Sequence, residues 1–145
     1  MADARSLYID LLIRCVSNTI YGDPSNEPGR IDRSYQFAIR NEGRDWPAVA
    51  HSMAGLKRLN NLRELTETIL NEKIPGDLIE TGVWRGGSCI LMRGILSAYG
   101  DTDRTVIVAD SFEGLPPPDA KRYPADKGDR LYTFGQLAIG VDTVK

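Results

Sequence analysis

The stretch Asp77-Leu78-Ile79-Glu80-Thr81-Gly82-Val83-Trp84-Arg85-Gly86-Gly87-Ser88 has the pattern of a strand that ends in a carboxylate, followed by a glycine loop and the start of a helix. A second apolar run, Val106-Ile107-Val108-Ala109, leads into Asp110. A strand, a glycine turn, a helix and a second acid-tipped strand form the first half of a nucleotide-cofactor site in α/β folds. The sequence therefore predicts a right-handed βαβ unit with Glu80 and Asp110 at the ligand-binding edge of its sheet.

The spacing of the glycines indicates which cofactor this loop suits. In a dinucleotide fingerprint a second glycine follows two positions after the first, close to the pyrophosphate, and here that position is Trp84. A P-loop ends in Gly-Lys-Ser or Gly-Lys-Thr, whereas Gly86-Gly87-Ser88 has no lysine. Two carboxylates would repel a pyrophosphate and attract the ammonium and sulfonium groups of S-adenosylmethionine. We therefore expect S-adenosylmethionine, although an ordinary tight turn with a solvated Glu80 would have the same local sequence.

Three further blocks of sequence accompany the motif Ile79–Gly87 and extend over nearly the whole chain. They are Leu7–Leu12 with Asn18–Tyr21, Asp45–Pro47 with Ala50–Met53 and Gly55–Leu59, and Ala109–Pro116 with Arg122–Asp126. In this order the four blocks resemble the macrocin O-methyltransferase family of class I S-adenosylmethionine-dependent methyltransferases. The resemblance implies a Rossmann-like fold, a homo-oligomer formed through the N-terminal region, and methyl transfer, with magnesium, to a sugar hydroxyl of a macrolide or related antibiotic.

The strand-end pattern and the resemblance together predict the cofactor-binding residues. We expect Glu80 and Asp110 to bind the cofactor through their carboxylates, and the free N–H groups at the start of the next helix to hold its methionine carboxylate. The resemblance alone places Met53 beside the cofactor. The only histidine, His51, is expected to be structural rather than catalytic. The complete predicted set is Met53, Glu80, Thr81, Gly82, Gly86, Gly87, Ser88, Asp110, Ser111 and Phe112.

Apolar periodicity predicts helices before and between the two strands. They are expected over Ser6–Ile20 (with Tyr8, Leu12, Cys15 and Val16 on one face), over Ser52–Lys73 (with Ser52 as N-cap), and over Ser88–Tyr99. The strands are expected over Asp77–Val83, buried on both faces, and over Thr105–Asp110.

The remaining segments are rich in turn-forming residues. We expect loops over 22–47 and 111–130, a short helix or ordered turn over 131–139, and a helix start at Asp142. The resemblance implies that the first loop helps to cover the substrate. The chain is thus expected to have two regions, a helical extension with a substrate-covering segment (1–76) and the βαβ unit (77–145).

The composition narrows the class of protein. With 145 residues, 26% charged residues and a net charge of −2, the chain is long enough for one globular domain and has no electrostatic reason to bind nucleic acid or an anionic membrane. No apolar run has transmembrane length and the N-terminus lacks the pattern of a signal peptide, so we expect a cytoplasmic protein. Cys15 and Cys89 are expected to be reduced and buried, and with one histidine they cannot complete a structural zinc site.

The chain supplies the first two strands of a sheet that is larger in the enzymes it resembles. In that family the magnesium-binding acids and the catalytic acid come from later strands. We therefore expect the chain to be the N-terminal part of a methyltransferase, with no metal ligand of its own and with the catalytic residue beyond Lys145. Two other classes stay open, a non-catalytic S-adenosylmethionine-binding or interaction module and a nicotinamide-dependent oxidoreductase. Trp84 argues against the second of these.

Overall fold

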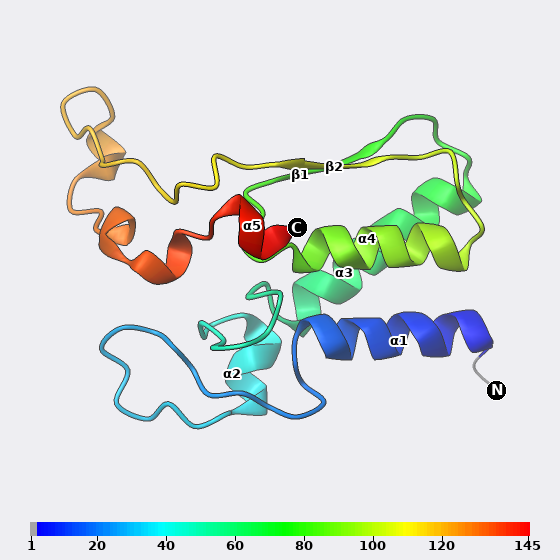
Figure 1. Ribbon diagram of the computed structural model, residues 1–145, viewed down its shortest axis with the longest axis horizontal. Coiled ribbons are helices and arrows are strands. Elements are labelled where there is room, and N and C mark those ends of the chain that lie inside the picture. The colour runs from blue at the N-terminus through cyan, green and yellow to red at the C-terminus, as the bar shows by residue number, and fades with distance from the viewer. Residues whose placement is uncertain (1–2) are drawn as a thin grey trace.

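Two parallel strands joined by a helix form the centre of the structure, a computed structural model that describes residues 3–145 (Figure 1). The strands are β1 (Leu78–Thr81) and β2 (Val106–Ala109). The helices are α1 (Ala4–Val16), α2 (Phe37–Glu42), α3 (Leu56–Asn71), α4 (Gly87–Ala98) and α5 (Val141–Val144). Single 3-10 turns occupy Pro124–Asp126, Leu131–Thr133 and Gly135–Leu137. Every helix and strand expected from the sequence is present within a few residues of its predicted bounds, and α2 is an addition.

The register of the sheet confirms the predicted βαβ unit. Leu78 pairs with Val106 and Thr81 pairs with Ala109 in a parallel ladder, and α4 makes the crossover between the two strands. Because parallel strands end at the same edge, Glu80 of β1 and Asp110 after β2 come to one side of the sheet. In Figure 1 this edge lies on the left, where the long loops of the chain also gather.

The central helix α4 is buried along most of its length. Seven of its 12 residues are buried, as expected for a helix that is apolar on more than one side. It packs against α1, α3 and both strands. The closest approach is at Gly94, where a Cβ atom would lie 2.2 Å from Leu12 Cδ2 of α1. A side chain at this position would therefore have to displace the side chain of Leu12.

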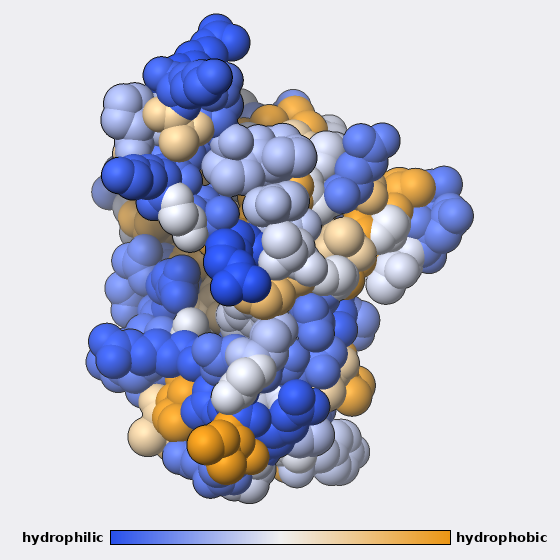
Figure 2. Space-filling model, turned by 90° about the vertical axis from the view of Figure 1, so that its left-hand side faces the viewer, coloured by the Kyte–Doolittle hydropathy of each residue, from blue (hydrophilic) through white to orange (hydrophobic). Residues whose placement is uncertain are grey.

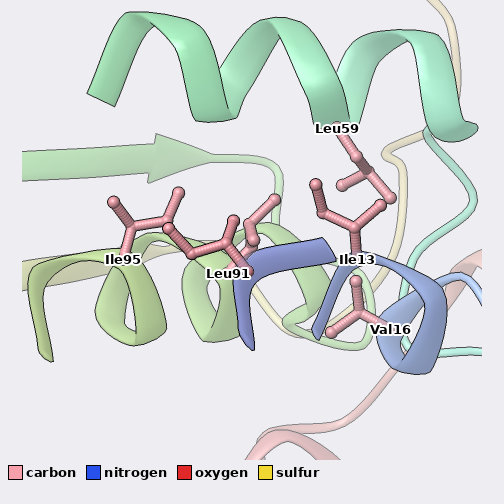
Figure 3. Packing of buried hydrophobic residues seen from close by; sticks show 6 residues of the cluster. Ile13, Val16, Leu59, Leu91 and Ile95 are labelled. Atoms are coloured by element: carbon pink, nitrogen blue, oxygen red, sulfur yellow. The ribbon is translucent and has the colours of Figure 1, made fainter. Parts of the chain in front are cut away.

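The sheet, the α3–α4 pair and α1 follow one another as layers in Figure 1. A core cluster joins the three helices, and Figure 3 shows its side chains pointing toward one another. Its buried members are Ile9, Ile13, Val16, Leu59, Leu91 and Ile95. The helical region before residue 77 and the βαβ unit therefore share one hydrophobic core.

The face of α1 that packs on this core differs from the predicted face. Val16 is buried as expected, but Tyr8 is 46% exposed and Cys15 is exposed, while Ile9 and Ile13 are buried. Because α1 carries apolar residues on several sides, periodicity alone permits more than one core-facing stripe. Packing against α4 selects the stripe that contains Ile9 and Ile13.

The start of α3 also differs from the prediction. The helix begins at Leu56, and its N-cap residue is Gly55 rather than Ser52. Gly55 has a φ of 81°, which a serine would not adopt readily. Ser52 instead closes a turn, because its hydroxyl accepts a hydrogen bond from the Ala54 N–H at 3.1 Å. The Ser52 N–H donates to the carbonyl of Val16 at 2.9 Å and ties this turn to the end of α1.

One face of the sheet carries exposed apolar residues. Ile79 and its register partner Ile107, which share this face, are 57% and 43% exposed. The prediction that β1 is buried on both faces is therefore wrong for the part of the chain that the structure describes, since its helices pack on only one face. None of the described helices combines the length and the hydropathy needed to cross a membrane.

A buried arginine organises the segment that was predicted to be an irregular loop. Arg40 of α2 is fully buried and donates hydrogen bonds to Asp45 at 2.8 Å, to Asp23 at 2.9 Å and to the carbonyl of Ser17 at 2.8 Å. Burial by itself would lower the pKa of Arg40, but its bonds to the two carboxylates outweigh burial and raise that pKa above its ordinary value. This network explains why a helix forms where periodicity did not predict one.

We expect Arg40→Ala to lower the free energy of unfolding by about 3–5 kcal/mol, because it leaves two buried carboxylates without their counter-charge. The exposed Arg33 provides a matched control, and Arg33→Ala should change the free energy by no more than about 0.5 kcal/mol. Urea denaturation of the purified protein measures both values. Equal effects of the two substitutions would show that the buried network is not a main support of this segment.

Candidate functional site

Two adjoining cavities lie at the carboxyl edge of the sheet. The first, of about 380 Å³, is lined by Glu80 and by the start of α4, and the second, of about 400 Å³, is lined by Asp110 and the loop after it. Met53, Gly82 and Trp84 line both. We call the two cavities together the strand-end cleft. They place the two acids that end the strands in one elongated site.

The glycine loop gives the cleft its floor. Gly82 has a φ of 88° and Gly86 a φ of 80°, conformations that glycine adopts without the steric cost of a side chain. Gly87 lies against the neighbouring segment, because its N–H donates to the His51 carbonyl at 3.0 Å and a Cβ atom there would lie 2.6 Å from that oxygen. His51 thus contributes its backbone, and its side chain is exposed at the rim of the first cavity.

The segment 47–53 is held against the glycine loop from two directions. On one side, Arg85 donates to the carbonyls of Pro47, Ala48 and Ala50 at 3.3, 2.9 and 3.2 Å. On the other side, the Asp23 carboxylate accepts hydrogen bonds from the N–H groups of residues 49 and 50, at N···O distances of 2.6 and 3.3 Å. Burial lowers the pKa of Arg85. These bonds fix the position of Met53 at the junction of the two cavities.

Asp110 connects the two loops that border the second cavity. Its carboxylate accepts the N–H of Val83 at 2.6 Å and the N–H of Phe112 at 2.9 Å. These backbone hydrogen bonds, that of Val83 above all, hold the pKa of Asp110 below its usual range. Because each carboxylate oxygen can accept more than one hydrogen bond, the ionised side chain keeps acceptor capacity for a ligand hydroxyl.

Glu80 is supported from behind by a thiol. The Cys89 side chain of α4 donates to one oxygen of the Glu80 carboxylate at 3.0 Å. Burial, together with this hydrogen bond to the negative charge, raises the pKa of Cys89 to about 12. The thiol is therefore neutral at physiological pH and acts as a hydrogen-bond donor. The prediction that both cysteines are buried is wrong for Cys15 and right for Cys89.

Aromatic contacts hold the segment 131–138 next to the cleft. Trp84 donates its indole N–H to the carbonyl of Gln136 at 2.9 Å, and the ring of Phe134 meets that of Trp46 edge to face at 5.4 Å. Leu137 from the same segment lines the second cavity. Trp84 makes its contact from the left-handed region, with a φ of 51°, at the position where a dinucleotide fingerprint has glycine.

The structure brings most of the predicted cofactor-binding residues together. Those that line the cleft are Met53, Glu80, Gly82, Gly87, Ser88, Asp110 and Ser111. Thr81, Gly86 and Phe112 line neither cavity and contribute through the backbone of the strand and loops. Binding of a cofactor by the residues of the predicted set stays a prediction. In residues 3–145 no three side chains of the kinds that bind metal ions converge on a common point.

The sequence did not single out several other residues that line the cleft. Among them are Arg58 in the first cavity, and Leu115, Pro116 and Leu137 in the second. Arg58, Leu115 and Pro116 lie in blocks that carried the family resemblance, which was the available signal. Leu137 had none, because it reaches the cleft through the contact between Trp84 and Gln136.

We expect a thiol reagent such as 5,5′-dithiobis(2-nitrobenzoate) to label Cys15 at pH 8 and to leave Cys89 unlabelled until the protein unfolds. Cys15 is exposed, whereas a pKa of about 12 leaves a thiolate fraction on the order of 10⁻⁴ at the buried Cys89. Peptide mass spectrometry locates the label. Labelling of both cysteines at similar rates in the folded protein would contradict the hydrogen bond to Glu80.

We expect Asp110→Ala to weaken binding of S-adenosylmethionine by about 1.5–3 kcal/mol, the range for a hydrogen bond to a charged group. Asp119 offers a matched control, since it also accepts two backbone N–H groups, those of Lys121 and Arg122, and lines neither cavity. Calorimetry should show unchanged affinity for Asp119→Ala. Unchanged affinity for Asp110→Ala would reject the role of Asp110 in binding.

Comparison with known proteins identifies what this chain is similar to. The family described as Macrocin-O-methyltransferase (TylF) matches residues 5–145. A solved structure, described as that of the O-methyltransferase NovP, has a TM-score of 0.88 and 48% identity, over 97% of this chain and 56% of that chain. The described residues therefore have part of a class I methyltransferase fold, as the sequence predicted.

Curated relatives belong to the same group of enzymes. Demethyldecarbamoylnovobiocin O-methyltransferase of Streptomyces niveus is 52% identical over 97% of this chain and 55% of its own length. Two others are 49% identical. The 8-demethyl-8-(2,3-dimethoxy-α-L-rhamnosyl)-tetracenomycin-C 4′-O-methyltransferase of Streptomyces olivaceus is matched over 99% of this chain and 55% of its length. Mycinamicin III 3″-O-methyltransferase of Micromonospora griseorubida is matched over 90% of this chain and 52% of its own length. The chain spans about half the length of these relatives.

Proposed function

This chain belongs to the macrocin O-methyltransferase family, and from that premise we propose that the protein transfers a methyl group from S-adenosylmethionine to a sugar hydroxyl of a glycosylated natural product. The observation that carries the proposal is the family match over residues 5–145, joined to a cleft that has a carboxylate at the end of each strand. Neither acid is neutralised by an arginine or lysine in the ion pairs of the described residues. They suit a cationic cofactor.

The two cavities match the two ends of S-adenosylmethionine in chemical character. The second cavity combines Asp110 with the apolar side chains of Leu115, Pro116 and Leu137, a combination that suits a ribose diol and a flat adenine ring. The first cavity contains Glu80 and the start of α4, which suit the amino-acid end. Met53 lies where the cavities meet and would therefore contact the middle of the cofactor.

When bound, the cofactor supplies a methyl group on a positively charged sulfur, which a hydroxyl oxygen can attack in line. The residues of this chain orient it: Asp110 by accepting hydrogen bonds from the ribose hydroxyls, and Glu80 by attracting the ammonium group. Holding the reacting groups in line converts a two-molecule encounter into a reaction within one complex, which is a major source of rate acceleration. Among residues 3–145 no group of three or more histidine, cysteine, aspartate or glutamate side chains could hold a metal ion, and none of these residues is proposed to remove the hydroxyl proton.

The acceptor is proposed from the relatives and from the surface around the cleft. The name of the Streptomyces olivaceus relative specifies an acceptor that carries a rhamnosyl group. The carboxyl ends of the strands face the left side of Figure 1, and Figure 2 shows that side as mostly hydrophilic, with separate hydrophobic patches. A surface of this kind suits a hydroxyl-rich sugar attached to an apolar aglycone.

We expect the full-length protein to bind S-adenosylhomocysteine, the product of methyl transfer, and to bind NADH at least about 100-fold more weakly, because Trp84 stands at the position where a dinucleotide fingerprint has the glycine that lets the backbone approach a pyrophosphate. Competition calorimetry measures both affinities. Binding of NADH without binding of S-adenosylhomocysteine would overturn the proposal in favour of an oxidoreductase. Tight binding without methyl transfer to any glycosylated acceptor would instead indicate a non-catalytic module.

A further inference from the structure

One cation in the first cavity has no structural partner. Arg58 lines this cavity and takes part in no ion pair and no side-chain hydrogen bond within residues 3–145. The other two cations of α3 are both paired: Lys57 with Glu42, and Arg63 with Asp10 and Glu67. Arg58 is exposed to solvent and is therefore the cation of α3 that is available to a ligand in this cavity.

The location of Arg58 is electrostatically unfavourable for the helix. It is the third residue of α3, and a cation in the first turn is repelled by the positive end of the helix dipole. Its guanidinium lies over Gly43, which also lines the cavity, at a place where a Cβ atom would be 2.9 Å from Nη2. The side chain is therefore directed along the cavity wall rather than away from it.

The surroundings of Arg58 would favour a bound anion. The first two residues of α4, Gly87 and Ser88, line this cavity together with Arg58, and α4 has no side-chain cap. The N-terminus of α4 and the guanidinium form a region of positive potential. Glu80 supplies a negative charge in the same cavity, with one of its oxygens held by Cys89.

Opposite charges in one small cavity match a zwitterion. The amino-acid end of S-adenosylmethionine carries an ammonium and a carboxylate on the same carbon atom. We propose that Arg58 binds this carboxylate while Glu80 binds the ammonium, so that the pair selects ligands with an intact amino-acid end. This inference rests on the proposed function and adds to it a binding residue and the ligand group that the residue recognises.

The test compares two ligands that differ only in the carboxylate, S-adenosylhomocysteine and its decarboxylated analogue, in the full-length protein by calorimetry. Arg58→Gln should raise the Kd for S-adenosylhomocysteine at least about 10-fold and leave the Kd for the analogue unchanged. Arg58→Lys should restore part of the affinity, since it keeps the charge without the planar fork. Lys57→Gln, the matched loss of a neighbouring charge, should change neither Kd.

The outcomes separate this inference from the proposed function. Equal affinity of Arg58→Gln and the wild-type protein for S-adenosylhomocysteine would overturn the role of Arg58 and leave the proposed function standing. Equal weakening for both ligands would also overturn it, because it would show a general effect on the cavity rather than recognition of the carboxylate. Absence of binding of either ligand to the wild-type protein would refute the proposed function, and this inference with it.

Discussion

The segment 47–53 is the constraint on which the candidate site depends, because it joins the N-terminal helices to the glycine loop. Asp23, itself held by the buried Arg40, binds the backbone N–H groups of this segment, and Arg85 binds its carbonyls. The N–H of Gly87 adds the contact that brings the start of α4 against it. Each of the bonds to the segment itself is made to its backbone, so its position does not depend on its own side chains.

The two acids of the cleft have a structural role as well as a proposed binding role. Asp110 joins the loop after β1 to the loop after β2 through two backbone N–H groups. Glu80 accepts a hydrogen bond from the Cys89 thiol, and this bond connects β1 to α4. A ligand would meet carboxylates whose orientation is already set, which reduces the conformational entropy lost on binding. A substitution at either acid therefore affects the shape of the cleft together with its charge.

Local patterns were sufficient to predict the βαβ unit and the edge at which its acids meet. Alternation of apolar runs, glycines and acids depends on neighbours in the sequence, and the parallel pairing of two crossover-linked strands then brings Glu80 and Asp110 to one edge. The resemblance added Met53, which lies at the junction of the cavities. Less local features were predicted less well, since both the buried stripe of α1 and the start of α3 depend on contacts with other elements.

The sequence by itself therefore determined the family, the two strands, the glycine loop and the acidic character of the candidate site, because each depends on residues that lie close together along the chain. Only the tertiary structure decided which distant groups meet. Arg40 and Asp23 are separated by 17 residues, and Arg85 and Pro47 by 38. Nothing in the local sequence distinguishes a buried, paired arginine such as Arg40 from an exposed, unpaired one such as Arg58. The packing of α1 and α3 on α4 makes these distinctions, because it determines which side chains lose contact with water.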